Sequence, residues 1–584
     1  RAFETGDGKA AAQEAWELLL GEGSAIPLHE LAELAFGDSG PVAAWAAFRL
    51  LAEGLYFAGT TTSIVPRKRE DVEAEIKKRE GKERETGERE QFLQRMRRYM
   101  KAPPGSPEEF AGDNRFIQDI EALAFGKSAK SKTMKELGLE ESPEEAHALL
   151  LKTGFWNSYI NPHPARFGLS HVSAKTVPAP PPHEERRDLC HLAAFAIDSP
   201  WSDDPDDAVS FEESGGAWIL YVHIADPASS IAADSQIERE ARDRGATLYL
   251  PEGSARMIAC EALPIFALGL AEKSPALTFK IKLERNGEFD EIADIEIFPS
   301  LVKVRRLTYQ EADKLLDEVS GNEVGILRSL HKLAEGNMRR RSASGAVSIE
   351  FPEVHISVID DRVTIGPLVS YRSVDLVREC MLLAGEAAGL WALGRRGRNS
   401  EAAQPLAFPF VSQETGDIPK EILPGLAGSY QLRRCMRPRT LSSKPDPHWG
   451  LGLDIYTQVT SPLRRYTDLL AHLQIRALLR GRPPLSPDEL SSRLAAGEAT
   501  SQAVTQAERA SRLHWTLAYL SDKKDSIWDA VVFKKKGNRW AMIIPALALE
   551  TQVPLRKDLA PNDEVKLVLK SVNIPRGEAI FSEQ

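Results

Sequence analysis

The chain has 584 residues, too many for one hydrophobic core, and we expect three or more compact domains. Apolar residues make up 42% of it and charged residues 27%, which excludes global disorder. The formal net charge of −11 also excludes a simple basic coat for nucleic acid, unless the substrate enters a narrow channel where local cations dominate.

Three arginine clusters could supply such local charge, or could simply face water, as charged runs commonly do. They comprise Arg339, Arg340 and Arg341; Arg395, Arg396 and Arg398; and Arg433, Arg434, Arg437 and Arg439.

Cysteine spacing and apolar runs bear on the cellular compartment. The four cysteines, Cys190, Cys260, Cys380 and Cys435, form no CxxC pair, which indicates reduced thiols in the cytoplasm. The sequence has no apolar run of membrane-spanning length and no secretory signal pattern, so we expect no membrane association.

The N-terminal part of the chain is expected to fold as a winged-helix-like domain over residues 1–70. Residues 8–54 show helical periodicity, and the stretch LYFAGTTTSIVPR around Gly59 is typical of a hairpin. Such a domain binds nucleic acid or mediates protein contacts, and no residue here decides between these roles. Residues 71–182 begin with a densely charged stretch, typical of an exposed helix or a flexible connector, and end in the proline-rich TVPAPPPHEER.

The remainder predicts a mixed α/β catalytic domain over residues 183–524 and a small barrel of the oligonucleotide-binding (OB) type over 525–584. Within the first, AAFAIDS, AVSFEE and AWILYVHIADP are expected to be strands. In the barrel, Trp540 beside Lys534, Lys535, Lys536 and Arg539 suits single-stranded nucleic acid, or is a core tryptophan next to a solvated turn. The fold class is therefore multidomain α+β.

An acidic loop, IDSPWSDDPDD, lies between the first two of these strands. It contains Asp198, Asp203, Asp204, Asp206 and Asp207. Their repulsion can be relieved by water, by raised pKa values or by a hard divalent cation. Pro205 does not suit the turn of a calcium loop, so magnesium is the better candidate, with room for one or two ions.

A second stretch, TSPLRRYTDLLAHLQIRALLRG, predicts an amphipathic helix with Ser461 as N-cap and Pro462 in the first turn. Arg464 then also lies in the first turn, where the helix dipole disfavours a cation unless an anion such as phosphate lies nearby. The alternative is an ordinary surface pair between Arg464 and Asp468.

Together the two stretches resemble the ribonuclease II family of exoribonucleases, which carries ID…DxDD and, later, HFGLxL…YTxxTSPIRRYxDLxxH. The matching text here is IDSPWSDDPDD and HWGLGLDIYTQVTSPLRRYTDLLAH, with HIADPAS and LYLPEG between them. The resemblance covers about residues 185–525, with the terminal barrel also in its expected place.

The resemblance implies roles for individual residues. Asp198, Asp204, Asp206 and Asp207 match the family's four magnesium-binding aspartates, whereas Asp203 is an extra acid. Asp206 is expected to act closest to the attacking water, and Arg464 to clamp the scissile phosphate as the second catalytic residue.

Two further residues are expected at the substrate. Tyr249 matches the tyrosine that packs on the terminal nucleotide, although it could instead be a strand core residue. Glu508 keeps the family position near bound RNA.

The sequence also departs from the family pattern. Ser348 stands near the position of an aromatic stacking residue, and Arg378, followed by Glu379, replaces a glutamate expected near the 2′-hydroxyl. Relatives usually carry cold-shock barrels at the N-terminus, where this chain has the winged-helix-like domain.

The resemblance implies a processive, magnesium-dependent 3′-to-5′ exoribonuclease that degrades single-stranded RNA to nucleoside 5′-monophosphates as a cytoplasmic monomer. One alternative is a catalytically silent RNA-binding protein of the same fold, which predicts loss of an acidic ligand or of Arg464. The other is a DNA-directed metal nuclease.

Overall fold

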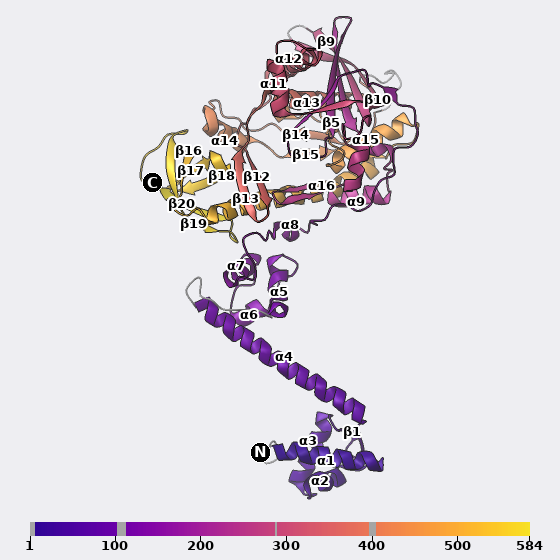
Figure 1. Cartoon of the computed structure of the whole chain (residues 1–584), viewed down its shortest axis with the longest axis vertical. Helices are drawn as coiled ribbons and strands as arrows, with labels where there is room; N and C mark the ends of the chain where they lie inside the picture. Colours follow the sequence, from indigo (N-terminus) through magenta and orange to yellow (C-terminus); the bar gives the residue numbers. More distant parts are fainter. Residues whose placement is uncertain (1–5, 102–112, 287–288, 396–404) are drawn as a thin grey trace. The chain divides into compact units, whose positions relative to one another are not determined.

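The computed structural model describes residues 6–101, 113–286, 289–395 and 405–584 (Figure 1). It divides into two compact units, one formed by Arg1–Ile120 and Ser131–Glu140 and the other by Glu121–Lys130 and Glu141–Gln584. The predicted arginine cluster around residue 396 is only partly described, because Arg396 and Arg398 lie outside these ranges.

The first unit begins with the expected winged helix. Its core gathers Trp16, Leu31, Phe57 and Ile64 from the helices and from the hairpin. Gly59 has φ 119°, and a Cβ there would lie 2.2 Å from the Ser63 carbonyl oxygen, so the hairpin requires glycine. The elements are α1 (Gly6–Glu22), α2 (Leu28–Phe36), α3 (Pro41–Glu53), β1 (Phe57–Thr60) and β2 (Ser63–Pro66).

The densely charged stretch that follows is a single helix, α4 (Arg69–Lys101), and not a flexible connector. Its buried side chains, Val72, Phe92, Leu93 and Met96, lie near its two ends, and the charged middle faces solvent. Four shorter helices come next, α5 (Asn114–Ala124), α6 (Lys132–Leu137), α7 (Pro143–Thr153) and α8 (His163–Arg166).

A seven-stranded sheet in the order β11-β4-β5-β6-β9-β10-β3 forms the centre of the second unit. Neighbouring strands are antiparallel except at the two edges, where β11 pairs parallel with β4 and β3 pairs parallel with β10. The three strands predicted around the acidic loop are confirmed as β4, β5 and β6. The strands are β3 (Arg187–Asp188), β4 (Ala194–Asp198), β5 (Asp207–Ser214), β6 (Ala217–Ala225), β9 (Ser274–Asn286), β10 (Phe289–Val302) and β11 (Val304–Thr308).

Three helices pack on this sheet and bury the largest core of the chain (Figure 1). They are α11 (Tyr309–Asp317), α12 (Asn322–Ala343) and α13 (Arg372–Ala392). Phe195, Leu220 and Phe279 from the strands meet Leu327 and Leu383 from the helices in this core. The sheet is thereby a rigid base for the acidic loop, which joins β4 to β5.

The other helices and strands between β3 and the C-terminal barrel do not belong to the seven-stranded sheet. The strands are β7 (Leu248–Leu250), β8 (Gly253–Ala255), β12 (Val354–Ile359), β13 (Arg362–Pro367), β14 (Phe410–Gln413) and β15 (Arg439–Ser442). The helices are α9 (Gln236–Arg244), α10 (Leu263–Phe266), α14 (Gly425–Cys435), α15 (Tyr466–Leu479) and α16 (Pro487–Ser521).

Helix α15 is buried on more than the one apolar face that the sequence predicted. Apart from Thr467, its residues from Tyr466 to Arg476 are buried, polar ones included. The polar side chains are satisfied by partners distant in sequence: His472 Nε2 lies 2.7 Å from the Val459 carbonyl oxygen, and Gln474 donates to the Ala407 carbonyl at 2.7 Å. Burial of polar residues is possible here because each finds a hydrogen bond.

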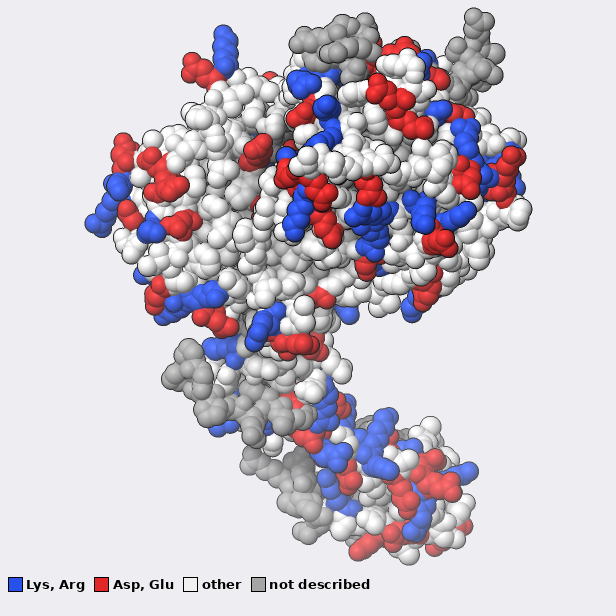
Figure 2. Space-filling model, turned by 45° about the horizontal axis from the view of Figure 1, so that its top comes forward, with Lys and Arg blue, Asp and Glu red and all other residues white. Residues whose placement is uncertain are grey.

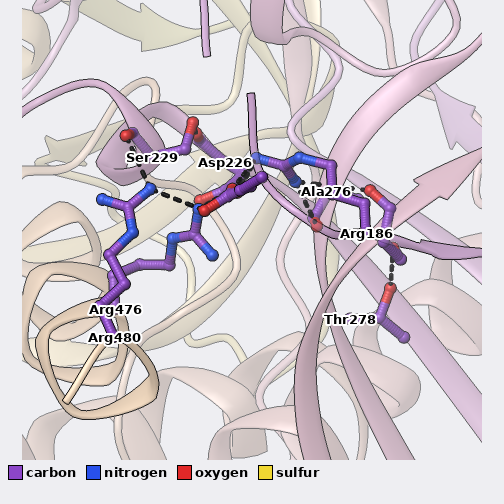
Figure 3. A network of polar contacts seen from close by, with 9 residues as sticks. Arg186, Asp226, Ser229, Ala276, Thr278, Arg476 and Arg480 are labelled. Carbon is purple, nitrogen blue, oxygen red and sulfur yellow. Dashed lines mark hydrogen bonds and ion pairs between the residues drawn. The ribbon is translucent and has the colours of Figure 1, made fainter. Parts of the chain in front are cut away.

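A buried ion-pair network ties α15 to the sheet and to the proline-rich segment before it (Figure 3). Asp226, which directly follows β6, accepts from Arg186 at 2.9 Å and lies 3.4 Å from Arg476. Glu184 pairs with Arg476 and, at 2.9 Å, with Arg480. Removing one partner of such a buried network leaves an uncompensated charge, so the network fixes the position of α15.

The C-terminal barrel has the strand order β18-β17-β16-β19-β20, all antiparallel, and β18 lies near β20, so it is nearly closed. The OB-type fold is confirmed. Trp540 is only 4% exposed and belongs to the barrel core, so its reading as a stacking residue is wrong. The strands are β16 (Ile527–Lys536), β17 (Arg539–Ile544), β18 (Leu549–Val553), β19 (Glu564–Asn573) and β20 (Glu578–Glu583).

Candidate active site

The acidic loop begins and ends on adjacent strands of the central sheet. Asp198 is the last residue of β4 and Asp207 the first of β5. The return of the loop is held by its backbone, since Ala225 N donates to the Asp206 carbonyl at 2.7 Å and Leu268 N to the Pro205 carbonyl at 2.9 Å. The aspartates therefore lie on a fixed backbone, where β4 ends and β5 begins.

Asp206 is the most constrained of these carboxylates. Its Oδ1 accepts from the Leu463 backbone N–H at 2.9 Å, and its Oδ2 lies 3.3 Å from Arg464 Nε. The Oδ2 atom is buried and accepts no hydrogen bond among the described residues. Burial raises the pKa of Asp206 well above its usual range, although Arg464 opposes this shift.

Asp198 and Asp207 share this environment. Burial and the charge of Asp198 raise the pKa of Asp207 to about 7. Burial and the charge of Asp204 raise the pKa of Asp198, while Arg464 lowers it. A bound cation would offset both the burial and the mutual repulsion of these carboxylates.

Asp204, by contrast, turns to partners in the protein. It pairs with Arg256 and accepts from the Tyr249 hydroxyl at 3.0 Å, and Arg256 also pairs with the extra acid Asp203. In the described ranges no three acidic, histidine or cysteine side chains stand at metal-coordinating spacing. Sequence reasoning missed Arg256, because nothing in the text ARM marks it as the partner of a loop some fifty residues earlier.

Asp198, Asp206 and Asp207 nevertheless fit a hard divalent cation. The buried Asp206 Oδ2 lacks a donor in the described structure, and all three groups are oxygen ligands of the kind that magnesium prefers. Asp204 could join them by leaving Arg256.

Arg464 lies before α15 and not in its first turn, so the predicted helix start at Ser461 is wrong. The helix begins at Tyr466, and Arg464 belongs to a tight turn closed by a hydrogen bond of 2.9 Å from Arg465 N to the Ser461 carbonyl. Asp468 accounts for this geometry, because its buried carboxylate accepts from Ser461 N at 2.8 Å. Asp468 lies in the first turn of α15, so this bond fixes Ser461 beside the start of the helix.

The expected surface pair between Arg464 and Asp468 does not form. Asp468 instead pairs with Arg465, at 2.7 Å. Arg464 is left beside Asp206, with its side chain 43% exposed. Its guanidinium is thus anchored on one side by a carboxylate and open to solvent on the other.

Backbone hydrogen bonds join this turn to the segment that leads into β7. Thr247 N donates to the Arg464 carbonyl, and Tyr466 N donates to the Gly245 carbonyl, both at 2.9 Å. A Cβ on Gly245 would lie 2.6 Å from the Ser501 backbone nitrogen, so this crossing requires glycine. The segment before β7 thus supports the turn that brings Leu463 and Arg464 into direct contact with Asp206.

Tyr249 lies on β7 with 40% of its surface exposed, so its reading as a strand core residue is wrong. Its hydroxyl donates to Asp204, and its backbone N–H donates to Glu508 Oε1 of α16 at 2.8 Å. Tyr309, the first residue of α11, was not singled out in the sequence. Burial, together with the charges of Asp198 and Asp207, raises its pKa to about 12, which places its phenol near these carboxyls.

The arginine clusters are largely paired with acids. Arg340 pairs with Glu386, and Arg341 with Glu379. The third cluster makes similar pairs, Arg433 with Glu550, Arg437 with Asp417 and Arg439 with Glu498. On the face that Figure 2 shows, acidic and basic side chains are interspersed.

Glu379 is 1% exposed and lies in the protein interior, while Arg378 pairs with Asp375 on the surface at 2.7 Å. Glu379, which pairs with Arg341, therefore offers no free carboxylate to a ribose, and Arg378 has none to offer. Over the described residues, no helix has the length and apolar character needed to cross a membrane.

Comparison with known proteins agrees with this architecture. The RNB domain matches residues 186–400 and 425–481, a double helix-turn-helix domain 72–162, and the ribonuclease II winged-helix domain 10–71. A protein of Synechocystis named an uncharacterized ribonuclease is 30% identical, over 97% of this chain and 87% of its own. The chain belongs to the ribonuclease II family.

Two further similar proteins have lower sequence identity. A chloroplastic/mitochondrial ribonuclease II of Arabidopsis thaliana is 27% identical over 98% of this chain and 75% of its own length. RNase R of Mycoplasma genitalium, solved with ribose-methylated single-stranded RNA, aligns with a TM-score of 0.59 and 19% identity over 68% of this chain and 72% of that one. The multidomain α+β fold with a winged helix, a catalytic domain and an OB-type barrel is thus confirmed.

Proposed function

We infer that the chain is a processive 3′-to-5′ exoribonuclease that hydrolyses single-stranded RNA to nucleoside 5′-monophosphates with one or two magnesium ions. The observation that carries this proposal is the contact between Asp206 and Arg464. Two stretches more than 250 residues apart in the sequence place a buried carboxylate and a half-exposed guanidinium 3.3 Å apart. Opposite charges at one open site suit a phosphodiester, whose cleavage needs a base or metal ligand and a phosphate-binding cation.

Each residue has a distinct role in this proposal. Arg464 donates hydrogen bonds to the phosphoryl oxygens of the last phosphodiester, and the tight turn limits its movement. Tyr249 supplies an exposed ring for the terminal base, with its backbone held by Glu508. Asp206 orients the attacking water through Oδ2, which accepts no hydrogen bond from the described residues.

Asp198, Asp204, Asp206 and Asp207 would hold magnesium, which supplies Lewis-acid stabilisation of the charge on the phosphate. Water attacks the phosphorus, the bond to the 3′ oxygen of the preceding nucleotide breaks, and that oxygen takes up a proton. The products are a nucleoside 5′-monophosphate and an RNA one nucleotide shorter, with a new 3′-hydroxyl.

We propose that the chain acts as a cytoplasmic monomer with functional boundaries near residues 70, 182 and 524. The silent RNA-binding alternative predicts loss of an acidic ligand or of the clamp arginine, and the chain retains all of them. The DNA-directed alternative predicts that a substrate without 2′-hydroxyls is cleaved as fast as RNA.

One assay tests direction, product and cation need together. The purified chain is incubated with single-stranded RNA labelled at the 5′ end or at the 3′ end, with magnesium or with EDTA, beside DNA of the same sequence. We expect labelled mononucleotide at once from the 3′-labelled RNA, and shortening of the 5′-labelled RNA only with magnesium. Internal cleavage, equal cleavage of DNA, or equal rates in EDTA would contradict the proposal.

A further inference from the structure

An exposed tryptophan lies on the loop that carries the catalytic aspartates. Trp201 is 51% exposed, although it is only three and five residues from Asp204 and Asp206. One face of its indole is covered by the imidazole of His355 on β12, with ring centroids 3.9 Å apart and planes inclined by 20°. A nearly parallel stack of this kind holds the indole in one orientation and leaves its other face available.

The segments that carry the two stacked residues both contact the hairpin of β7 and β8, on which Tyr249 lies. On the Trp201 side, Asp204 accepts from the Tyr249 hydroxyl, and Asp203 pairs with Arg256, which follows β8. On the His355 side, Val358 N donates to the Pro251 carbonyl at 2.9 Å. The acidic loop, β12 and β7 thus form a closed ring of contacts, and both exposed rings belong to it.

Helix α16 adds a further link between the stack and the substrate side of the site. Arg512 donates to the Val354 carbonyl, next to His355, at 3.1 Å. Burial lowers the pKa of His355 and the charge of Arg512 lowers it further, while burial raises the pKa of Glu508 and Arg512 opposes that rise. The guanidinium therefore acts electrostatically on both side chains. Glu508 in turn holds the backbone of Tyr249.

We propose that Trp201, backed by His355, is a second stacking surface for a base of the bound single-stranded RNA, besides the one at Tyr249. An unpaired base stacks on any flat aromatic face, and a rigid, half-exposed indole on the rim of the site loses little conformational freedom in doing so. The inference rests on the proposed function, because the base belongs to the RNA in that site.

The test measures whether one base of the RNA stacks on the Trp201 ring. Binding is measured with the full chain carrying Asp206→Asn, with magnesium, so that RNA is not consumed. The probes are ten-nucleotide oligouridylates in which each position in turn is abasic. At one position other than the 3′-terminal one, we expect the abasic RNA to bind about 5- to 100-fold more weakly than intact RNA.

Trp201→Ala should weaken binding of intact RNA by a similar factor and remove the penalty of that abasic position. Trp201→Phe keeps a ring on His355 and should show an intermediate penalty there, which guards against a misfolded alanine variant. Trp45→Ala is the matched control, because Trp45 is also an exposed tryptophan stacked on a neighbour, Phe48, at 5.6 Å in the winged helix. It should leave the abasic penalty unchanged.

Two results would overturn the proposal. In one, Trp201→Ala binds intact RNA as tightly as the parent. In the other, each abasic position weakens RNA binding in both Trp201 variants as much as in the parent, which would show that the stack only stabilises the acidic loop. Hydrolysis of 3′-labelled RNA by the unsubstituted chain is measured in parallel, so failure of the exoribonuclease proposal is seen independently of the stacking result.

Discussion

The turn that presents Arg464 depends on one buried carboxylate, so we expect Asp468→Ala to damage both stability and turnover. Asp468 is fully buried and accepts from Ser461 N at 2.8 Å and from Arg465 Nε and Nη2 at 3.0 and 2.7 Å. The substitution leaves the Ser461 amide buried and unpaired, at a cost of about 1–3 kcal/mol. Loss of one partner of a buried ion pair costs about 3–5 kcal/mol. Because the Arg465 side chain is 33% exposed, we expect the free energy of unfolding to fall in total by about 3 kcal/mol, the lower end of that range.

Asp468→Asn keeps an oxygen for the Ser461 amide and should cost only about 1–2 kcal/mol. Since a shift of about 1 Å in a catalytic group can cost about 100-fold in rate, turnover should fall by that order in the alanine variant and less in the asparagine variant. Urea unfolding and steady-state RNA hydrolysis measure the two effects. Asp375→Ala is the control, because it removes an exposed pair with Arg378 worth at most about 1 kcal/mol. An Asp468→Ala variant no less stable than this control, with full turnover, would refute the reasoning.

Three further predictions follow from the site and its surroundings. Arg464→Ala should lower turnover about 100- to 1000-fold with a smaller loss of RNA affinity, and Arg464→Lys should recover only part, as single-turnover rates and RNA titrations would show. EDTA should abolish hydrolysis without changing the circular dichroism spectrum, and excess magnesium should restore it; an EDTA-resistant rate would exclude a cation. Burial lowers the pKa of His147 and His163 to about 3 and of His514 to about 4. The unfolded chain then binds more protons below pH 6.5, so stability should fall with pH from about 6.5 towards 4, by up to about 1.4 kcal/mol per pH unit for each histidine. Urea midpoints at pH 7.5 and 5 test this, and a His147→Phe variant should show a smaller difference.

The sequence predicted correctly the elements that depend mainly on residues close together in the chain. The strands on both sides of the acidic loop, with Asp198 and Asp207 at their ends, were predicted correctly because apolar runs and turn residues act over a few positions. The winged helix and the barrel were predicted for the same reason.

The sequence failed where a distant or competing partner decides the outcome. Ser461 has the properties of an N-cap, but the helix starts five residues later at Tyr466, and Asp468 of that helix binds the Ser461 amide. Arg256 and His355 were missed because they meet the acidic loop only in the folded chain. Arg464 was singled out for a helix-dipole conflict that does not exist, yet it does lie beside Asp206, the carboxylate that we propose to be catalytic. Its place there comes from the Leu463 and Thr247 backbone contacts, which no spacing rule encodes.

Binding and turnover of one Asp206→Asn variant on one single-stranded RNA test the central claim most directly. Asparagine keeps the oxygen that accepts from Leu463 N, so the turn should keep its place while the ionised carboxylate is lost. The account predicts an affinity within about threefold of the unsubstituted chain and a turnover lower by at least about 1000-fold. Turnover within tenfold of the unsubstituted chain would remove Asp206 from the chemistry and contradict the account.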